Sequence, residues 1–194
     1  FVPEHTHIPT SRRSPFPGGG ELPKQYSHTL DPFVSLGFAA AATKSLKIGT
    51  GICLLPQRDP IVTAKSIASL DLMSNGRFVL GLGGGWNVDE MENHGVTYKT
   101  RFSMMKEHVL AMKSLWVDEE AEFHGEYVNF DKSWAYPKPV QKPYPPILMG
   151  GETDYTLKRV VDYCDGWFPR GRGGFDAGES MQRLKNMADK SNRD

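Results

Sequence analysis

The sequence predicts an α/β fold built on a parallel sheet. Short apolar runs typical of buried strands alternate along the chain with longer segments of helical pattern. Two Asp-Pro pairs, at 31–32 and 59–60, each predict a helix start, because aspartate caps the first turn and proline fits the first helical position. The alternation favours either a barrel or a doubly wound sheet, and the residues alone leave both open.

The first half of the chain contains two strand–helix units. A helix is expected from residue 32 to about 43, followed by a strand at 46–55 that two glycines interrupt. The next helix begins at residue 60 and ends at an Asn-Gly pair, 75–76, which is a typical helix C-terminus. A buried strand at 77–82 follows directly.

The second half continues this order after an insertion. Residues 101–116 form an amphipathic helix, because their apolar side chains recur at steps of three and four. An exposed hairpin at 121–130 and a proline-rich connector make up an insertion, residues 117–145. The remaining expected elements are a buried strand at 146–151, a helix at 155–163, a short strand at 165–169 and a polar helix at 176–194. We expect residues 1–194 to form one domain.

Composition narrows the class of protein. The 194 residues carry 23 Lys and Arg against 23 Asp and Glu, whereas binders of nucleic acid or anionic membranes normally show a basic excess. The longest apolar run, 33–42, is too short to span a bilayer, and the N-terminus lacks the pattern of a secretion signal. Cys53 and Cys164 are therefore interpreted as buried thiols of a cytoplasmic protein rather than as a disulfide.

A glycine-rich turn follows the strand at 77–82. Gly81 and Gly83 to Gly85 lead into a polar segment, Asn87 to Glu90, that opens a helix. Backbone N–H groups at such a helix start can hold a phosphate, and glycine lets the anion come close. The spacing G-x-G-G-G is not the dinucleotide fingerprint, and a tight connection without a ligand explains the turn equally well.

Eight motifs, taken in order, resemble the luciferase-like monooxygenase superfamily, and its branch of probable coenzyme F-420-dependent oxidoreductases in particular. They are Val-Pro-Glu-His at 2–5, Asp-Pro-Phe at 31–33, Ile-Gly-Thr-Gly-Ile at 48–52, Pro-Gln-Arg-Asp-Pro at 56–60, Ala-Lys-Ser-Ile-Ala-Ser-Leu-Asp-Leu-Met-Ser-Asn-Gly-Arg at 64–77, Gly-Leu-Gly-Gly-Gly-Trp at 81–86, Pro-Pro-Ile-Leu-Met-Gly-Gly at 145–151 and Asp-Gly-Trp-Phe-Pro at 165–169.

The resemblance implies a TIM-type (β/α)8 barrel that binds FMN or F-420 at the C-terminal ends of its strands. Only about five of the eight strands are expected here, so the resemblance implies a chain truncated at both ends: a fragment, a shortened paralogue or one part of an assembly. The exposed core of an incomplete barrel favours a homo-oligomer, in particular a dimer. The loop at 9–24, rich in Pro, Gly, Ser and Arg, is expected to be mobile and to cover the site.

The resemblance also assigns site residues one by one. His5 would donate a proton or stabilise charge on the reduced ring, with Glu4 orienting it. Gly51 and Ile52 match a bond that is often a non-proline cis peptide behind the ring. The other expected cofactor contacts are Gly83, Gly84, Gly85 and Trp86, which line the chain or ring, and Gly150 and Gly151, which hold the phosphate. Trp167 is a further candidate for the ring wall, although core packing explains Trp86 and Trp167 nearly as well. Arg101 is a candidate for the phosphate, although a solvated arginine at a helix start is the default explanation.

Three hypotheses follow from these residues. The first is an F-420-dependent oxidoreductase, with FMN as the alternative cofactor, that transfers a hydride to or from a small organic substrate. The second is a non-catalytic flavin-binding or structural relative. The third, a metal-dependent barrel hydrolase, rests only on His5-x-His7, and because no carboxylate cluster at ligand spacing accompanies this pair we expect no metal site.

Overall fold

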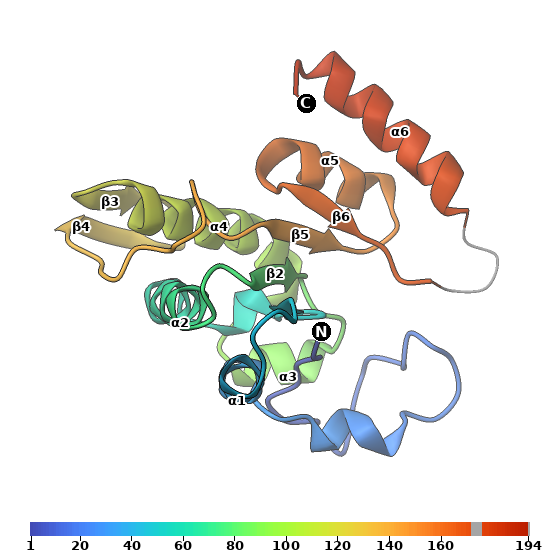
Figure 1. Cartoon of the computed structure of the whole chain (residues 1–194). Coiled ribbons are helices and arrows are strands. Elements are labelled where there is room, and N and C mark those ends of the chain that lie inside the picture. Colours follow the sequence, from blue (N-terminus) through green and yellow to red (C-terminus); the bar gives the residue numbers. More distant parts are fainter. Residues whose placement is uncertain (172–175, 194) are drawn as a thin grey trace.

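The computed structural model describes residues 1–171 and 176–193. Its centre is a four-stranded sheet in the order β1-β2-β5-β6, in which all neighbouring strands run parallel (Figure 1). The strands are β1 Ile48–Gly49, β2 Phe78–Leu82, β5 Ile147–Gly150 and β6 Gly166–Phe168. The predicted α/β class with a parallel sheet is therefore confirmed.

The N-terminal residues extend this sheet beside β1. The backbone N–H of Val2 donates to the carbonyl of Gly49 over 3.0 Å, and the N–H of Gly51 donates to the carbonyl of Val2 over 2.7 Å. Val2 and Thr50 form a parallel bridge. Four strands and this bridged segment account for about five of the eight strands of a barrel, as the sequence predicted.

The strand expected at 46–55 is shorter in the structure. Only Ile48–Gly49 forms a strand, and pairing continues as single bridges, from Thr50 to Val2 on one side and from Cys53 to Leu82 on the other. The chain then turns at once into the short 3-10 helix η2, Leu55–Gln57. The apolar alternation in this segment thus reflects burial in a bulged segment rather than a continuous strand.

The predicted helices form close to their expected bounds. Asp31 caps its helix by accepting from the N–H groups of Phe33 and Val34, and Asp59 caps the next by accepting from Val62. The helices are α1 Pro32–Ala42, α2 Pro60–Met73, α3 Val88–Asn93, α4 Arg101–Val117, α5 Asp154–Tyr163 and α6 Ala177–Lys190, with 3-10 turns η1 Lys24–His28 and η3 Tyr98–Thr100. The helix expected at 176–194 ends earlier, at Lys190, and residue 194 lies outside the described residues.

The core lies between the sheet and the helices α2 and α4. Phe78, Leu80 and Ile147 of the sheet are fully buried, together with Met105 and Met112 of α4. The apolar stripe predicted for α4 therefore packs in the core. Burial of this kind supplies most of the free energy that holds helices to a sheet.

The insertion leaves this core and returns to it. Its strands, β3 Ala121–His124 and β4 Asn129–Ser133, pair antiparallel and project from the end of α4 (Figure 1). The connector is then tied back to the core by Gln141, whose side-chain amide donates to Asp71 over 2.7 Å and to the carbonyl of Phe78 over 2.8 Å. The hairpin is confirmed, with its second strand ending at 133 rather than 130.

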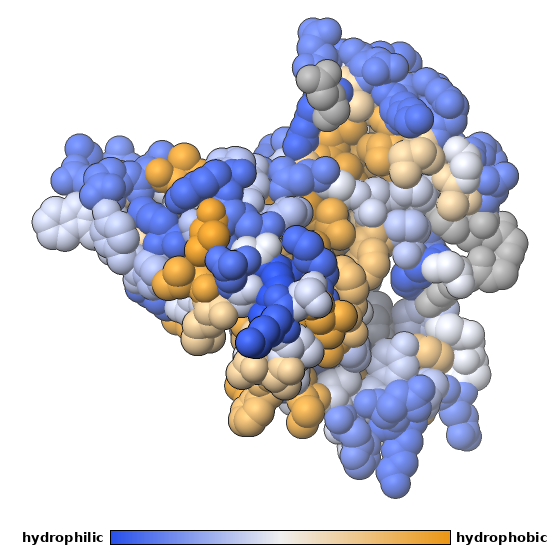
Figure 2. All heavy atoms as spheres, in the orientation of Figure 1, coloured by the Kyte–Doolittle hydropathy of each residue, from blue (hydrophilic) through white to orange (hydrophobic). Residues whose placement is uncertain are grey.

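Apolar side chains remain exposed on the outer face of α1. Figure 2 shows them gathered over this helix, and Val34 and Phe38 are 63% and 78% exposed. Self-association through such a face is compatible with these exposures, and the expected dimer stays a prediction. In the part of the chain that the structure describes, no helix is long and apolar enough to cross a bilayer.

Candidate functional site

A cavity of about 480 Å³ opens at the C-terminal ends of the parallel strands. All ten residues that the sequence assigned to the site line it, although they come from distant parts of the chain. They are Glu4 and His5, Gly51 and Ile52 after β1, Gly83, Gly84, Gly85 and Trp86 after β2, and Gly150 and Gly151 at the end of β5. This is the edge at which parallel barrels place their active sites.

Glycines make room for the side chain of Ile52 on the floor of the cavity. A Cβ atom on Gly83 would lie 2.2 Å from Cδ1 of Ile52, and one on Gly150 would lie 3.1 Å from its Cγ2. The Gly51–Ile52 peptide bond is cis, as the sequence predicted. The floor is therefore apolar and shaped by Ile52, with glycines from two neighbouring strands beneath it.

His5 is held at the cavity wall by Glu90 of α3. Its Nδ1 lies 2.8 Å from Oε2 and 3.0 Å from Oε1 of Glu90. The side chain of Glu90 is 1% exposed and that of His5 is 6% exposed, so the pair is shielded from water. With Nδ1–H donated to the carboxylate, Nε2 is the ring nitrogen left to exchange a proton with a ligand.

The expectation that Glu4 orients His5 is wrong. The carboxylate of Glu4 is buried and accepts from the backbone N–H of Leu54 over 2.7 Å and from Nε of Arg58 over 2.6 Å. Burial by itself lowers the pKa of the Arg58 guanidinium, but the Glu4 carboxylate reverses this and holds the pKa above its ordinary value. Asp31 completes the network with a 2.7 Å bond to Arg58. Glu4 therefore joins the N-terminal segment to the start of η2.

The structure places Gly150 and Gly151 just before the start of α5, and their expected role in holding a phosphate stays a prediction. Thr153 caps the helix, and Gly151 before it has a φ of +128°, a conformation that favours glycine. Gly150, Gly151 and Thr156 line the cavity beside this helix start, where free N–H groups attract anions. Trp167 does not line the cavity, and its indole Nε1 donates to the carbonyl of Gly151 over 2.7 Å.

In the glycine turn before α3, side chains of the protein itself accept from backbone N–H groups at the helix start. Asn87 caps this helix, and the N–H of Val88 donates to the hydroxyl of Ser14 over 3.0 Å. The chain itself therefore uses one of the donors that the turn would otherwise offer to an anion. Of the two glycine–helix pairs, the one at Gly150 and Gly151 stays the predicted phosphate site.

The loop at 9–24 carries site residues that sequence reasoning missed. Phe16 and Pro17 line the cavity, and so does Tyr26 of η1 just beyond the loop. The rings of Phe16 and Tyr26 lie 5.2 Å apart, and Tyr26 lies 5.4 Å from His5. Arg13 anchors the loop to α3 through a 2.8 Å ion pair with Asp89. The loop thus covers the His5 end of the cavity, while its mobility stays a prediction.

Glu90 is the other residue that was missed. Its signal in the sequence was that of a helix start, because an acidic side chain in the first turn stabilises a helix. Nothing local marks it as a partner of a histidine in the N-terminal segment.

The two histidines that suggested a metal site, His5 and His7, contact different partners. His5 points to Glu90, whereas Nε2 of His7 lies 2.9 Å from Nδ2 of Asn93 at the surface. Among residues 1–171 and 176–193, no group of three or more His, Cys, Asp or Glu could hold a metal ion.

Burial, with the charge of Glu4, raises the pKa of the Cys53 thiol well above its ordinary value, so this thiol stays protonated at neutral pH.

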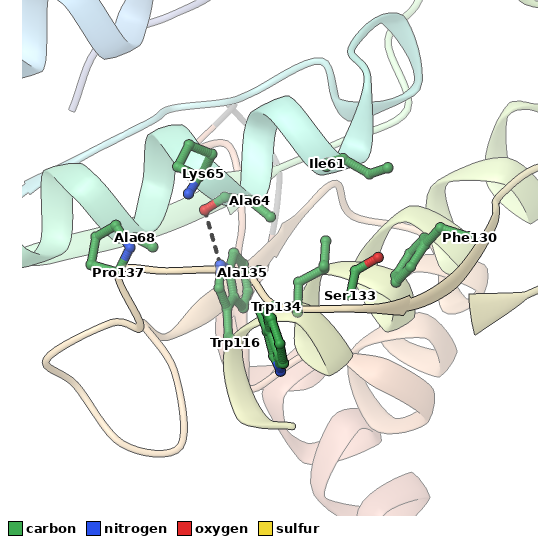
Figure 3. Close-up of a pocket in the computed structure, with 11 residues that line it drawn as sticks. Ile61, Ala64, Lys65, Ala68, Trp116, Phe130, Ser133, Trp134, Ala135 and Pro137 are labelled. Atoms are coloured by element: carbon green, nitrogen blue, oxygen red, sulfur yellow. Dashed lines mark hydrogen bonds between the residues drawn. The ribbon is translucent and has the colours of Figure 1, made fainter. Parts of the chain in front are cut away.

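A second, smaller hollow lies outside the sheet. It measures about 130 Å³ and is bounded by α2, α4, β4 and the segment that follows β4, as Figure 3 shows. Trp116 is one of the residues that line it, and its Nε1 donates to the carbonyl of Ala64 over 3.0 Å. None of its lining residues lines the central cavity. We assign this hollow no role in the site.

The family model for the luciferase-like monooxygenases matches residues 2–194. The chain belongs to this family. The match covers every motif on which the resemblance was based.

Relatives with curated names differ in cofactor. An uncharacterised protein of Mycobacterium tuberculosis is 44% identical over 198 residues, which are 100% of this chain and 70% of that protein. The F-420-dependent hydroxymycolic acid dehydrogenase of the same organism is 29% identical, over 77% of this chain and 42% of its own length. The FMNH2-dependent dimethylsulfone monooxygenase of Pseudomonas putida is 28% identical, over 77% of this chain and 40% of its own length. The family thus contains enzymes of both cofactor types.

Solved structures of the family share the fold. A monooxygenase from Streptomyces bottropensis superposes with a TM-score of 0.75 at 23% identity, covering 90% of this chain. The coenzyme F-420-dependent tetrahydromethanopterin reductase of Methanopyrus kandleri superposes with a TM-score of 0.71 at 22% identity, covering 86%. These neighbours are luciferase-like TIM barrels, and this chain spans 54% and 52% of their lengths. The predicted incomplete TIM-type barrel is confirmed at the level of fold.

Proposed function

We propose that this chain binds a deazaflavin or flavin in the central cavity and transfers a hydride between this cofactor and a small organic substrate. Coenzyme F-420 is the first choice and FMN the alternative. The observation that carries the proposal is the buried pair of His5 and Glu90 at the wall of the cavity.

The cavity has the size and lining that a flat, anionic cofactor needs. Its volume, about 480 Å³, lies within the range of small-molecule sites. A planar ring would lie against Ile52, whose position depends on Gly83 and Gly150. Gly151 and Thr156, at the start of α5, would hold the phosphate. Two features of one cavity, an apolar floor and an anion-binding end, thus match the two parts of the cofactor.

The bound cofactor supplies the group that accepts or donates the hydride. The chain supplies proton transfer and exclusion of water. Nε2 of His5 would take the proton of a substrate hydroxyl in the oxidising direction and would return it in the reverse direction. Glu90 fixes the ring through Nδ1 and stabilises the imidazolium that forms. Phe16 and Tyr26 keep this end of the cavity apolar.

Titration of the purified protein with F-420 and with FMN tests the proposal, with fluorescence quenching as the readout. Saturable binding of one cofactor supports the site and identifies the cofactor. Turnover is then tested by following the absorbance of the bound cofactor with a panel of small alcohols and ketones. Binding without turnover on any substrate favours the non-catalytic alternative, and binding of neither cofactor contradicts the proposal.

A further inference from the structure

A groove with cationic walls lies between α4 and α5, beside the central cavity. We call it the α4–α5 groove; it has a volume of about 250 Å³. Lys106 of α4 and Lys158 and Arg159 of α5 line it, and Asp162 is the acidic residue among the lining side chains. Phe102 lines both the groove and the central cavity, so the two spaces are neighbours.

The positive charge of the groove is not neutralised by the chain. Asp162 is already engaged in a 3.1 Å ion pair with Lys158. Lys106 and Arg159 form no ion pair with any residue that the structure describes. Asp162 also acts on Arg159, because its charge raises the Arg159 pKa that burial lowers. Three cationic side chains against this one carboxylate still leave the groove with a net positive charge.

A second guanidinium, that of Arg101, lies near the groove but does not line it. Arg101 and Arg159 both lie over the ring of Phe102, with 4.2 Å and 3.7 Å from the guanidinium carbon to the ring centroid. Burial, and then the like charge of Arg159, lowers the pKa of Arg101. Nε of Arg101 is buried and has no hydrogen-bond partner within the described part of the chain. Partly buried like charges without a counter-ion are unfavourable, and an anion bound beside Arg159 would offset that cost.

Tyr163 lines the same groove and carries a buried hydroxyl. Tyr163 is 4% exposed, and its hydroxyl has no hydrogen-bond partner among the described residues. Burial raises the pKa of this phenol, which therefore remains protonated and able to donate. A buried polar group normally has a partner, and a ligand oxygen would provide one here.

We propose that the α4–α5 groove binds an anionic group, a phosphate or carboxylate, between Lys106 and Arg159. Two sources have this chemistry. One is an acidic extension of the cofactor in the central cavity, which would pass Phe102; the side chain of F-420 carries a phosphate and glutamate carboxylates, whereas FMN ends in one phosphate. The other is a separate small anion. Only the first source rests on the function proposed above.

Calorimetric titration of the wild type and of a Lys106→Gln, Arg159→Gln double variant tests the groove. The probes are F-420, the same deazaflavin without phosphate and glutamates, and inorganic phosphate. A Lys44→Gln, Lys185→Gln variant is the matched control, because it removes two charges at other surface positions. Circular dichroism checks that each variant is folded.

The groove is supported if the acidic probe that binds the wild type binds the double variant about tenfold or more weakly, while the control stays within about twofold. If the wild type binds F-420 more tightly than the deazaflavin without phosphate and glutamates, and the double variant loses this preference, the anion in the groove is part of the cofactor. If the double variant loses the phosphate binding that the wild type shows without cofactor, the groove binds a separate anion. This conclusion holds even if neither cofactor binds and the proposed function fails. The proposal is overturned if the double variant binds every probe like the wild type, or if the wild type binds no acidic probe.

Discussion

His5 and Glu90 are 85 positions apart in the sequence, and their side chains meet at 2.8 Å in the wall of the central cavity. The N-terminal segment brings His5 beside β1, and the turn after β2 brings Glu90 to the same edge of the sheet. The buried carboxylate leaves one ring nitrogen of His5 for the ligand. The chemistry proposed here depends on this pairing.

Replacing His5 by Asn is expected to lower kcat by about 100-fold or more, because general acid–base catalysis typically contributes that much. Glu90→Gln keeps an oxygen for Nδ1 but removes the charge, so a smaller loss is expected. Steady-state kinetics with the cofactor identified by titration measures both. Cofactor affinity should stay within about threefold in each variant, and an unchanged kcat in His5→Asn contradicts the role of this histidine.

Replacing Gly83 by Ala is expected to weaken cofactor binding by about tenfold or more. The new methyl group would lie 2.2 Å from Cδ1 of Ile52, so that side chain must move off the cavity floor. Fluorescence titration measures the affinity. Gly37→Ala is the control: nothing lies within 4 Å of its Cβ position on α1, and the change should raise the free energy of unfolding by about 0.5–1 kcal/mol. Equal affinities in both variants would show that Ile52 does not support the ring.

Replacing Glu4 by Gln is expected to lower the free energy of unfolding by about 3 kcal/mol, because it removes one partner of a buried ion pair. The side chains of Glu4 and Arg58 are 2% and 19% exposed. Urea denaturation measures the loss. Asp162→Asn, which breaks the exposed pair with Lys158, should cost about 0.5 kcal/mol or less. Similar losses in the two variants would mean that the Glu4 network is not what holds the N-terminal segment.

His108 is expected to make stability depend on pH. The imidazole is buried in α4 with Nδ1 3.2 Å from the carbonyl oxygen of Leu55, and burial lowers its pKa. Below the ordinary pKa of about 6.5, the imidazole binds a proton in the unfolded state but not in the folded state. The free energy of unfolding therefore falls as the pH drops from about 6.5 to the lowered pKa of the folded state.

Between pH 7.5 and 5.5 this loss of stability is about 1.4 kcal/mol at most. Urea denaturation at the two values should show a smaller difference for His108→Gln than for the wild type. His124→Gln, at an exposed position, serves as the control and should behave like the wild type. A pH dependence that survives in His108→Gln must come from other groups.

Replacing Phe16 by Ala is expected to raise KM for an apolar substrate by about tenfold, because the ring helps to close the His5 end of the cavity. Phe38→Ala, on the exposed face of α1, is the matched control. The cofactor affinity should not change in either variant. A Phe16→Ala enzyme with normal KM would place the substrate elsewhere in the cavity.

The elements that the sequence predicted correctly are those specified by neighbouring residues. The caps of Asp31 and Asp59 form as expected because a cap joins a side chain to backbone groups two or three positions away. The strand at 46–55 was predicted too long because its apolar pattern reports burial, whereas its pairing partners, Val2 and Leu82, are distant in the sequence. Periodicity cannot distinguish a bulged segment from a strand.

The sequence by itself determined the parallel α/β class, the order of the elements and, through motifs, ten residues that line one cavity. Only the tertiary structure decided which carboxylate binds His5, that Ser14 occupies a donor of α3, and that Arg101 and Arg159 flank Phe102. The physical reason is the range of the interactions. Helix caps and apolar periodicity act over a few residues, whereas hydrogen bonds and charge contacts at the site depend on how strands and loops far apart in the chain are brought to one edge of the sheet.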